Sequence, residues 1–314
     1  MPLNLISITE GCYILVGSPR QPAPGLIVNA DQKTAILIDS GPNDNVAKDI
    51  DKTVSGAGYQ IIAIINTHHH ADHCGGNHFF QCKYPNIKIY ATEYEKTFIE
   101  HPFLEPMYLS SGAHTFSFVG NSPFLNAKPS QVTNVIPNED GYILSEQGFQ
   151  LTVRTLPGHT RGMIGIGTKN RVFYCADALF SRMVMSNHGL LFHTCIDEAL
   201  KTLDKILNLT ESYFSISMYH GGLATDVHEL VSINKEKILE VSGFLLQTIN
   251  NRANISIDDI VGVAVCRFEN SEVEITPSQF LLNRTVIMAF LADMERAKII
   301  NIKIYEGKLV AQRN

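Results

Sequence analysis

Histidines and an aspartate crowd into residues 67–77 of the chain, THHHADHCGGN. Neutral imidazole is the commonest protein ligand for zinc and similar metal ions. If the chain stays extended for a few residues beyond residue 65, His68 and His70 point to the same side while His69 points away. The spacing therefore predicts that one metal ion takes two ligands, His68 and His70, from this short segment.

Asp72 and His73 come next, just before the pair Gly75-Gly76. A turn at this point would bring the two side chains toward a second metal position. The preceding run 61–65, IIAII, is β-branched and too short for a typical helix, so it predicts a buried strand. The alternative is a histidine-rich surface tract with incidental metal affinity. A strand before the motif and a Gly-Gly turn after it favour a built site.

Three more candidate ligands follow strand-like runs further along the chain. They are His159 in PGHTRG, Asp177 in ADALF and His220 in YHGG. Each one alone would be an ordinary structural residue, but together with the first motif they supply the ligand set of two adjacent metal ions. Asp39 also ends a strand-like run, LIDSG, although a turn former or a helix cap is the alternative for it.

Composition limits the classes of function. The chain has 314 residues and a net charge of −6 without a long basic run, which argues against a protein that gains its affinity by neutralising phosphates. Its 6 cysteines form no CxxC pair and predict reduced thiols. The N-terminus lacks the basic start of a signal peptide, and no apolar run is long enough to cross a bilayer. We therefore expect a cytoplasmic protein without a membrane partner.

The hydrophobic pattern places these candidates between strands and helices. The first 40 residues predict an antiparallel meander. Alternating or continuous apolar runs predict strands over 12–16, 26–29, 35–38, 61–65, 87–91, 149–156, 163–167, 172–175 and 214–218. Amphipathic spacing predicts helices over 46–50, 77–80, 92–98 and 197–207.

Two regions depart from this alternation. Residues 101–148 mix aromatic side chains with Pro and Gly, which predicts an irregular lid or pocket wall; a surface excursion packed by its own side chains is the alternative. Residues 226–314 predict three helices, over 226–252, 256–266 and 277–297, and then a hairpin over 300–311. Helices followed by a hairpin are typical of a winged-helix module. Because Lys and Arg are not dense here, we expect this module to pack, close a pocket or form a homodimer rather than read DNA.

Residues 1–225 resemble the metallo-β-lactamase-fold hydrolase superfamily, whose five motifs match Asp39, the 68–73 motif, His159, Asp177 and His220 in this order. The resemblance implies an α/β (α+β) fold, a four-layer αββα sandwich with a dinuclear site at one edge. It implies that the first metal ion is bound by His68, His70 and His159, and the second by Asp72, His73 and His220. Asp177 would bridge both ions, and Asp39 would orient the histidine loop from outside the ligand set.

Within the superfamily, the 67–77 motif, PGHT at 157–160 and DALF at 177–180 are similar to glyoxalase II, a thioester hydrolase. The usual Gly before the bridging aspartate is Ala176 here, and the C-terminal region differs from the glutathione-binding helices of that enzyme. The whole chain also resembles the β-lactamase-like protein 2 group, which joins this fold to a winged-helix-like tail and includes ribonucleases.

The sequence therefore predicts a hydrolase that acts on a small-molecule ester, thioester or lactone through a hydroxide bridging two divalent metal ions. Zinc is the first expectation for the metal, with iron or manganese as alternatives. By the resemblance, Asp72 would orient the hydroxide and carry its proton. Three other functions stay open: a metal-dependent phosphodiesterase or ribonuclease, a mononuclear iron persulfide dioxygenase, and a DNA-binding regulator without catalysis.

Overall fold

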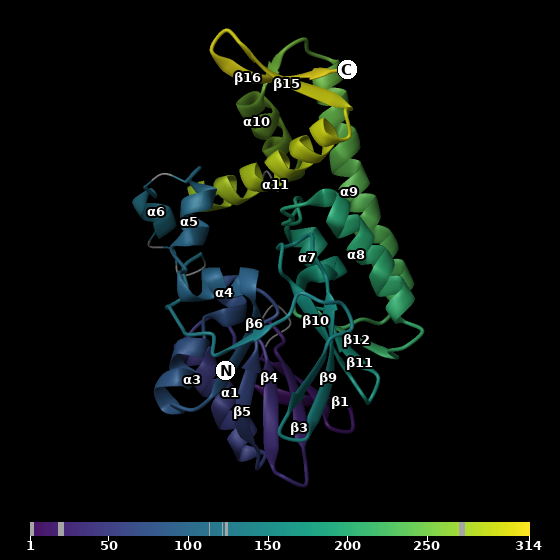
Figure 1. Ribbon diagram of the computed structural model, residues 1–314. Helices are drawn as coiled ribbons and strands as arrows, with labels where there is room; N and C mark the ends of the chain where they lie inside the picture. Colours follow the sequence, from purple (N-terminus) through teal and green to yellow (C-terminus); the bar gives the residue numbers. More distant parts are fainter. Residues whose placement is uncertain (1–2, 18–21, 113, 121, 123–124, 270–273) are drawn as a thin grey trace.

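Two β-sheets pack face to face and carry helices on their outer faces, which makes the four-layer αββα sandwich that the sequence predicts (Figure 1). The computed structural model describes residues 3–17, 22–112, 114–120, 122, 125–269 and 274–314. Apolar side chains of both sheets, among them Ile36, Ile65, Val153 and Ile166, form the core between them. This core explains the alternating pattern of the strands, since each strand turns one face inward.

The first sheet has the strand order β1-β2-β3-β4-β5-β6-β7. Its strands β1 to β4 form the expected antiparallel meander, and β4 to β7 run parallel. The bounds are β1 (Asn4–Thr9), β2 (Cys12–Val16), β3 (Gly25–Asn29), β4 (Thr34–Ile38), β5 (Gln60–Ile65), β6 (Lys88–Thr92) and β7 (Asn134–Ile136). The two edge strands, β1 and β7, are the ones that the sequence pattern does not predict.

The second sheet has the strand order β13-β12-β11-β10-β9-β8. Only the pair β11 and β12 is parallel among its described pairs. The bounds are β8 (Ile143–Glu146), β9 (Phe149–Thr155), β10 (Ile164–Thr168), β11 (Val172–Tyr174), β12 (Ser215–Met218) and β13 (Gly222–Leu223).

Helices cover the outer faces of both sheets. The first sheet is covered by α1 (Asp44–Gly56), α3 (Asn77–Lys83) and α4 (Glu93–Glu100), whose apolar side chains join those of the strands in one cluster. The second sheet is covered by α8 (Ile196–Leu209), and α9 (Val227–Asn250) packs against α8. The predicted helices are thus present, and most extend a few residues beyond their predicted ends.

The C-terminal region is the helical, winged-helix-like module that the pattern predicts. It contains the three predicted helices, observed as α9, α10 (Ile257–Phe268) and α11 (Pro277–Arg296), followed by the hairpin β15 (Ile300–Tyr305) and β16 (Lys308–Arg313). A short strand, β14 (Ile255–Ser256), pairs with β16 to give a three-stranded antiparallel sheet. Side chains of the C-terminal region share one core cluster with α8 and with the second sheet. Buried packing therefore continues across residue 225.

The prediction of an irregular segment over 101–148 is wrong for its last third. Residues 134–136 and 143–146 form β7 and β8, which pair with β6 and β9 at the edges of the two sheets. The earlier part contains two short helices, α5 (Leu104–Leu109) and α6 (Ser117–Gly120), which lie beside the start of α11 (Figure 1). Leu109 and Val119 pack there against Leu281 and Leu282. Pro123 and Phe124, which belong to the predicted lid over 101–148, lie outside the described residues.

Among the described residues, no helix combines the length and the apolar character that a membrane span requires.

Candidate metal centre

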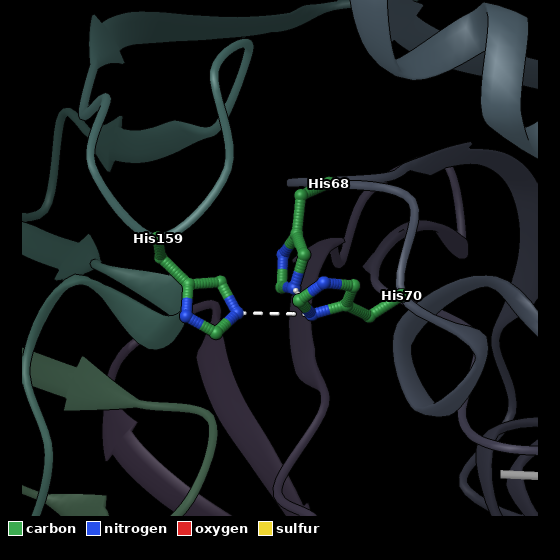
Figure 2. A group of neighbouring side chains, drawn as sticks. All are labelled: His68, His70 and His159. Atoms are coloured by element: carbon green, nitrogen blue, oxygen red, sulfur yellow. Dashed lines mark hydrogen bonds between the residues drawn. The ribbon is translucent and has the colours of Figure 1, made fainter. Parts of the chain in front are cut away.

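Three histidines from two loops face one another at one edge of the sandwich (Figure 2). His68 and His70 follow β5, and His159 follows β9. Nε2 of His68 lies 3.0 Å from Nδ1 of His70, and Nε2 of His159 lies 2.9 Å from the same Nδ1. The structure thus brings together the three side chains that the sequence predicts for one metal position.

A second group lies beside the first and contains Asp72, His73 and His220. Oδ2 of Asp72 lies 3.0 Å from Nε2 of His220 and 3.7 Å from Nε2 of His73. Asp72 and His73 belong to the short helix α2 (Ala71–Cys74), where the sequence predicts a turn. This helical turn places both side chains on the side of His220, which follows β12.

Asp177 lies between the two groups, in the 3₁₀ turn η1 (Ala176–Ala178). Its Oδ2 is 3.5 Å from Nε2 of His73, of His159 and of His220. Burial by itself would raise the pKa of Asp177, but the imidazoles of His220, His73 and His159 outweigh it and hold the pKa well below its usual range. Asp177 is therefore an ionised carboxylate within reach of both groups.

The donor atoms fit metal ions. Among the described residues, the buried atoms Nε2 of His73 and Oδ1 of Asp177 have no hydrogen-bond partner, although unpartnered buried polar atoms are costly. Burial is the largest factor that lowers the pKa of His68, His70 and His159, and neutral imidazole is the form that binds metals. For His73 and His220, burial is outweighed by the carboxylates of Asp72 and Asp177, which raise the pKa instead. Imidazoles gathered around carboxylates are a typical donor set for zinc and related ions.

Hydrogen bonds made by the Nδ1 atoms fix the orientation of the rings of His159 and His73. Nδ1 of His159 donates to the carbonyl oxygen of Phe192 over 2.8 Å, which leaves Nε2 free to face the centre. Nδ1 of His73 donates to Oδ2 of Asp39 over 2.8 Å. Asp39 also accepts from the backbone N–H of Thr67 over 2.8 Å and from its hydroxyl over 2.7 Å. Asp39 thus contacts the histidine loop directly. This contact goes further than the role of turn former or helix cap, which its position in the sequence also allowed.

His69 belongs to neither of the two ligand groups, but it does not point away from His70 as the alternation predicts: their ring centroids are 5.0 Å apart, and both rings lie near Glu105. The ring and the backbone N–H of His69 both donate to Oε2 of Glu95, a fully buried residue of α4. The other carboxylate oxygen of Glu95 accepts from the Thr160 hydroxyl and from the Gly162 N–H, each over 2.8 Å. Glu95 therefore ties together the loop that carries His68 and His70 and the loop that carries His159.

Glu105 of α5 is a further acidic group beside the centre, with Oε1 3.9 Å from Nε2 of His70. Burial raises the pKa of Glu105 to about 8, and the nearby carboxylates of Asp72 and Glu95 add to the effect, which His69 opposes. Sequence reasoning missed both Glu95 and Glu105. For Glu95 the sequence offered one signal of burial: it lies three and four residues before Phe98 and Ile99 in a predicted helix, so it shares their face. For Glu105 the sequence offered no such signal.

The glycine pair after the ligands has a packing role. A Cβ atom on Gly75 would lie 2.2 Å from the carbonyl oxygen of Pro42, and one on Gly76 would lie 2.2 Å from that of Ser40. The strand end that carries Asp39 thus runs directly against the residues that follow α2. Only glycine permits this approach, so the pair holds Asp39 close to His73.

A cavity of about 360 Å³ opens beside the ligand groups. It reaches from His70, Asp72 and His220 past α7 (Arg182–Asn187) to the side of α11. This volume lies within the range of about 300–1,000 Å³ that is usual for small-molecule sites. The arrangement can therefore hold a small substrate next to the two groups of candidate ligands.

The chain matches the model of one protein family, the metallo-beta-lactamase superfamily, over residues 17–217. It is 28% identical over 188 residues to a hydroxyacylglutathione hydrolase of Synechococcus sp. (strain JA-2-3B'a(2-13)), a match that covers 60% of this chain and 59% of that protein. It is 24% identical over 264 residues to the hydroxyacylglutathione hydrolase of Rippkaea orientalis (strain PCC 8801 / RF-1), covering 80% of this chain and 86% of that protein. The chain thus spans about three-fifths of the first of these relatives.

Solved structures share the whole fold at low sequence identity. A metallo-beta-lactamase family protein from Thermus thermophilus superposes with a TM-score of 0.72 and 20% identity, over 98% of this chain and 100% of that one. A beta-lactamase domain protein from Burkholderia ambifaria superposes with a TM-score of 0.74 and 13% identity, over 100% of this chain and 97% of that one. Both likenesses include the C-terminal module.

Proposed function

The chain belongs to the metallo-beta-lactamase superfamily, and we propose that it is a metal-dependent hydrolase whose two-metal centre cleaves an ester, thioester or lactone. One observation carries the proposal: two groups of three possible ligands share a single carboxylate, Asp177, whose Oδ2 lies 3.5 Å from histidines of both groups. Hydroxyacylglutathione hydrolases among the relatives, which cleave a thioester by their name, support the class of reaction.

The proposed ligands follow the two groups. One metal ion would be held by His68, His70 and His159, and the other by Asp72, His73 and His220, with Asp177 between them. Zinc is the first candidate because imidazole and carboxylate donors suit it, and iron and manganese are alternatives. Two such ions, when bound, would supply a lowered pKa for water and a Lewis acid toward the carbonyl of the substrate.

Asp72 is the proposed proton carrier of the chain itself. Burial would raise the pKa of Asp72, but His73 and His220 outweigh this effect and lower it. The carboxylate is therefore ionised at neutral pH and can accept a proton. It also lines the cavity, so a proton taken up there can pass to the leaving group without crossing the protein interior.

The walls of the cavity favour an acyl substrate over a nucleic acid. Apolar side chains of Leu125, Met183, Leu190 and Leu191 line it. Among the described lining residues there is no lysine or arginine to bind a phosphate group. These two features favour an acyl hydrolase over a phosphodiesterase or ribonuclease.

The first experiment is elemental analysis of the protein purified without added metal, read beside hydrolysis of a panel of thioesters, lactones and one phosphodiester. We expect two equivalents of metal per chain and turnover of acyl substrates. One equivalent of iron without hydrolysis would support the dioxygenase instead, and phosphodiester turnover alone would support the nuclease.

The matched variant is Asp177→Asn, with Asp140→Asn as its control. Asp140 is a partly exposed carboxylate that pairs with Arg154 and Lys205, away from the ligand groups. We expect Asp177→Asn to lose bound metal and at least about 100-fold in activity, because a shared ligand supports both positions. Full activity of this variant without metal would refute the scheme.

A further inference from the structure

The cavity beside the ligand groups continues away from the centre as a largely apolar chamber. Its far walls come from parts of the chain that are distant in sequence: Met183 and Val184 of α7, Leu190 and Leu191 of the following loop, and Leu282 and Val286 of α11. Leu190, Leu191 and Val286 are buried. The C-terminal module therefore builds one side of the chamber, opposite α7.

The chamber lacks basic side chains at its far end. Away from the proposed metal ligands and their neighbour Glu105, the described acidic side chain that lines it is Glu269, and no described lysine or arginine lines it. An anionic group on the substrate that lies beyond the metal positions would find no lysine or arginine to pair with, which costs free energy in a partly buried site. Neutral polar groups of the substrate avoid this cost, because the amides of Asn187 and Asn283 also line the chamber and can hydrogen-bond to them.

From these walls we infer that the chamber between α7 and α11 binds an apolar acyl chain, and that the preferred substrate is an uncharged medium-chain acyl ester, thioester or lactone. A thioester of glutathione, which carries two carboxylates, would be a poor substrate. This inference rests on the proposed function and names its substrate class. It separates this chain from its relatives that are named for a glutathione thioester.

The apolar walls set a chain-length dependence. Each methylene group transferred from water into such a chamber strengthens binding about fourfold. Four added methylenes, from acetyl to hexanoyl, should therefore raise kcat/KM about 200-fold on the same neutral leaving group. The increase should stop when the chain reaches the end of the chamber, whose volume is about 360 Å³.

The first test compares acetyl, butyryl, hexanoyl and octanoyl thioesters of N-acetylcysteamine, a neutral thiol, with hexanoyl glutathione, using the metal-loaded enzyme. We expect kcat/KM to rise with chain length and hexanoyl glutathione to be cleaved at least about 10-fold more slowly than the neutral hexanoyl thioester. Equal rates for acetyl and hexanoyl groups, or a preference for the glutathione thioester, would overturn the inference.

Variants of opposite walls locate the acyl chain. Leu282→Phe on α11 and Val184→Phe on α7 each fill part of the chamber. Met288→Phe is the matched control, because Met288 also lies on α11 but is exposed and does not line the chamber. We expect either chamber variant to lower kcat/KM for the octanoyl thioester at least 10-fold while the acetyl thioester changes less than twofold. Equal losses for both substrates in both chamber variants would overturn the assignment.

A binding measurement separates the chamber from the reaction. Hexanamide is neutral and carries the same chain without a cleavable ester, so calorimetry with the enzyme reports the chamber alone. We expect binding with a negative heat-capacity change that Leu282→Phe abolishes and Met288→Phe preserves. Such binding without hydrolysis of any thioester would uphold the chamber and refute the proposed function. Acyl turnover without hexanamide binding and without chain-length dependence would uphold the proposed function and refute the acyl-chain chamber.

Discussion

The ring of His69 donates a hydrogen bond to the carboxylate of Glu95. Burial alone would lower the pKa of His69, and the Glu95 carboxylate raises it above the usual value instead. Because Glu95 also accepts from Thr160 and Gly162, one buried carboxylate fixes the distance between the two histidine loops. Its partner His69 thus acts on the metal centre without facing it.

Glu95→Gln should weaken metal binding while leaving every proposed ligand in place. A Gln side chain offers only one acceptor oxygen, so either the His69 side or the Thr160 side of the network loses its bond. We expect a 10- to 100-fold loss of metal affinity, measured by competition with a chelator. Glu146→Gln is the control, since Glu146 is a buried carboxylate that pairs with Lys88 and Tyr90 far from the centre. Unchanged metal affinity in Glu95→Gln would show that the loops hold their positions by themselves.

Asp39→Asn should act mainly on His73. The carboxylate accepts hydrogen bonds from Thr67 and from Nδ1 of His73, and an amide nitrogen at that place would face these donors with hydrogens of its own. We expect metal occupancy to fall by about half, from two equivalents toward one, in elemental analysis after dialysis.

The matched control for this substitution is Asp51→Asn on α1. Asp51 is also buried, and it pairs with Lys83 and Tyr84 instead of the histidine loop. This control should lower the thermal midpoint and keep both metal equivalents. Equal metal content in the two variants would contradict the role of Asp39.

Gly75→Ala should destabilise the protein because the new Cβ atom would collide with the backbone of Pro42. We expect a loss of about 1–3 kcal/mol in the free energy of unfolding, measured with urea. Gly243→Ala in α9 is a sharp contrast, since nothing lies within 4 Å of the added Cβ atom. That substitution should stabilise the protein by about 0.5–1 kcal/mol, because alanine is the better helix former. Similar effects at both glycines would contradict the close-approach argument.

His193 should make the folded state sensitive to acid. It is buried next to His159 and Phe180, and burial lowers its pKa from 6.5 to about 3, with a further contribution from His159. The unfolded chain binds a proton at His193 below about pH 6.5 and the folded chain does not, so stability falls as the pH falls. Between pH 8 and pH 5 this single group should cost about 2 kcal/mol.

The variant His193→Gln removes this titration. Urea unfolding at pH 8 and pH 5 should show a smaller loss of stability in the variant than in the natural protein. His228→Gln, at an exposed position of α9, should behave like the natural protein. A pH dependence in His193→Gln equal to that of the natural protein would contradict the prediction.

The sequence by itself determined the ligand candidates and the elements that carry them. His68, His70, Asp72 and His73 are close in sequence and follow one strand, so local spacing alone predicts their shared site. Strands such as β5 and β9 are predictable because each buries a continuous or alternating apolar face. The strand-end positions of His159, Asp177 and His220 predicted that they join the same site, and the superfamily resemblance assigned each of them to a metal position.

Only the tertiary structure decided which other groups surround that centre. Glu95 and Glu105 resemble any helix glutamate in the sequence. Glu95 is buried with partners that are 26 to 67 residues away, and Glu105 of α5 is buried beside His70. The edge strands β7 and β8 are short and gain their order from pairing with β6 and β9. The chamber is likewise a product of long-range packing, since α7 and α11 meet across it although about 90 residues separate them. Local pattern predicts a strand, a helix or a ligand motif, whereas burial and pocket shape depend on which distant surfaces come together.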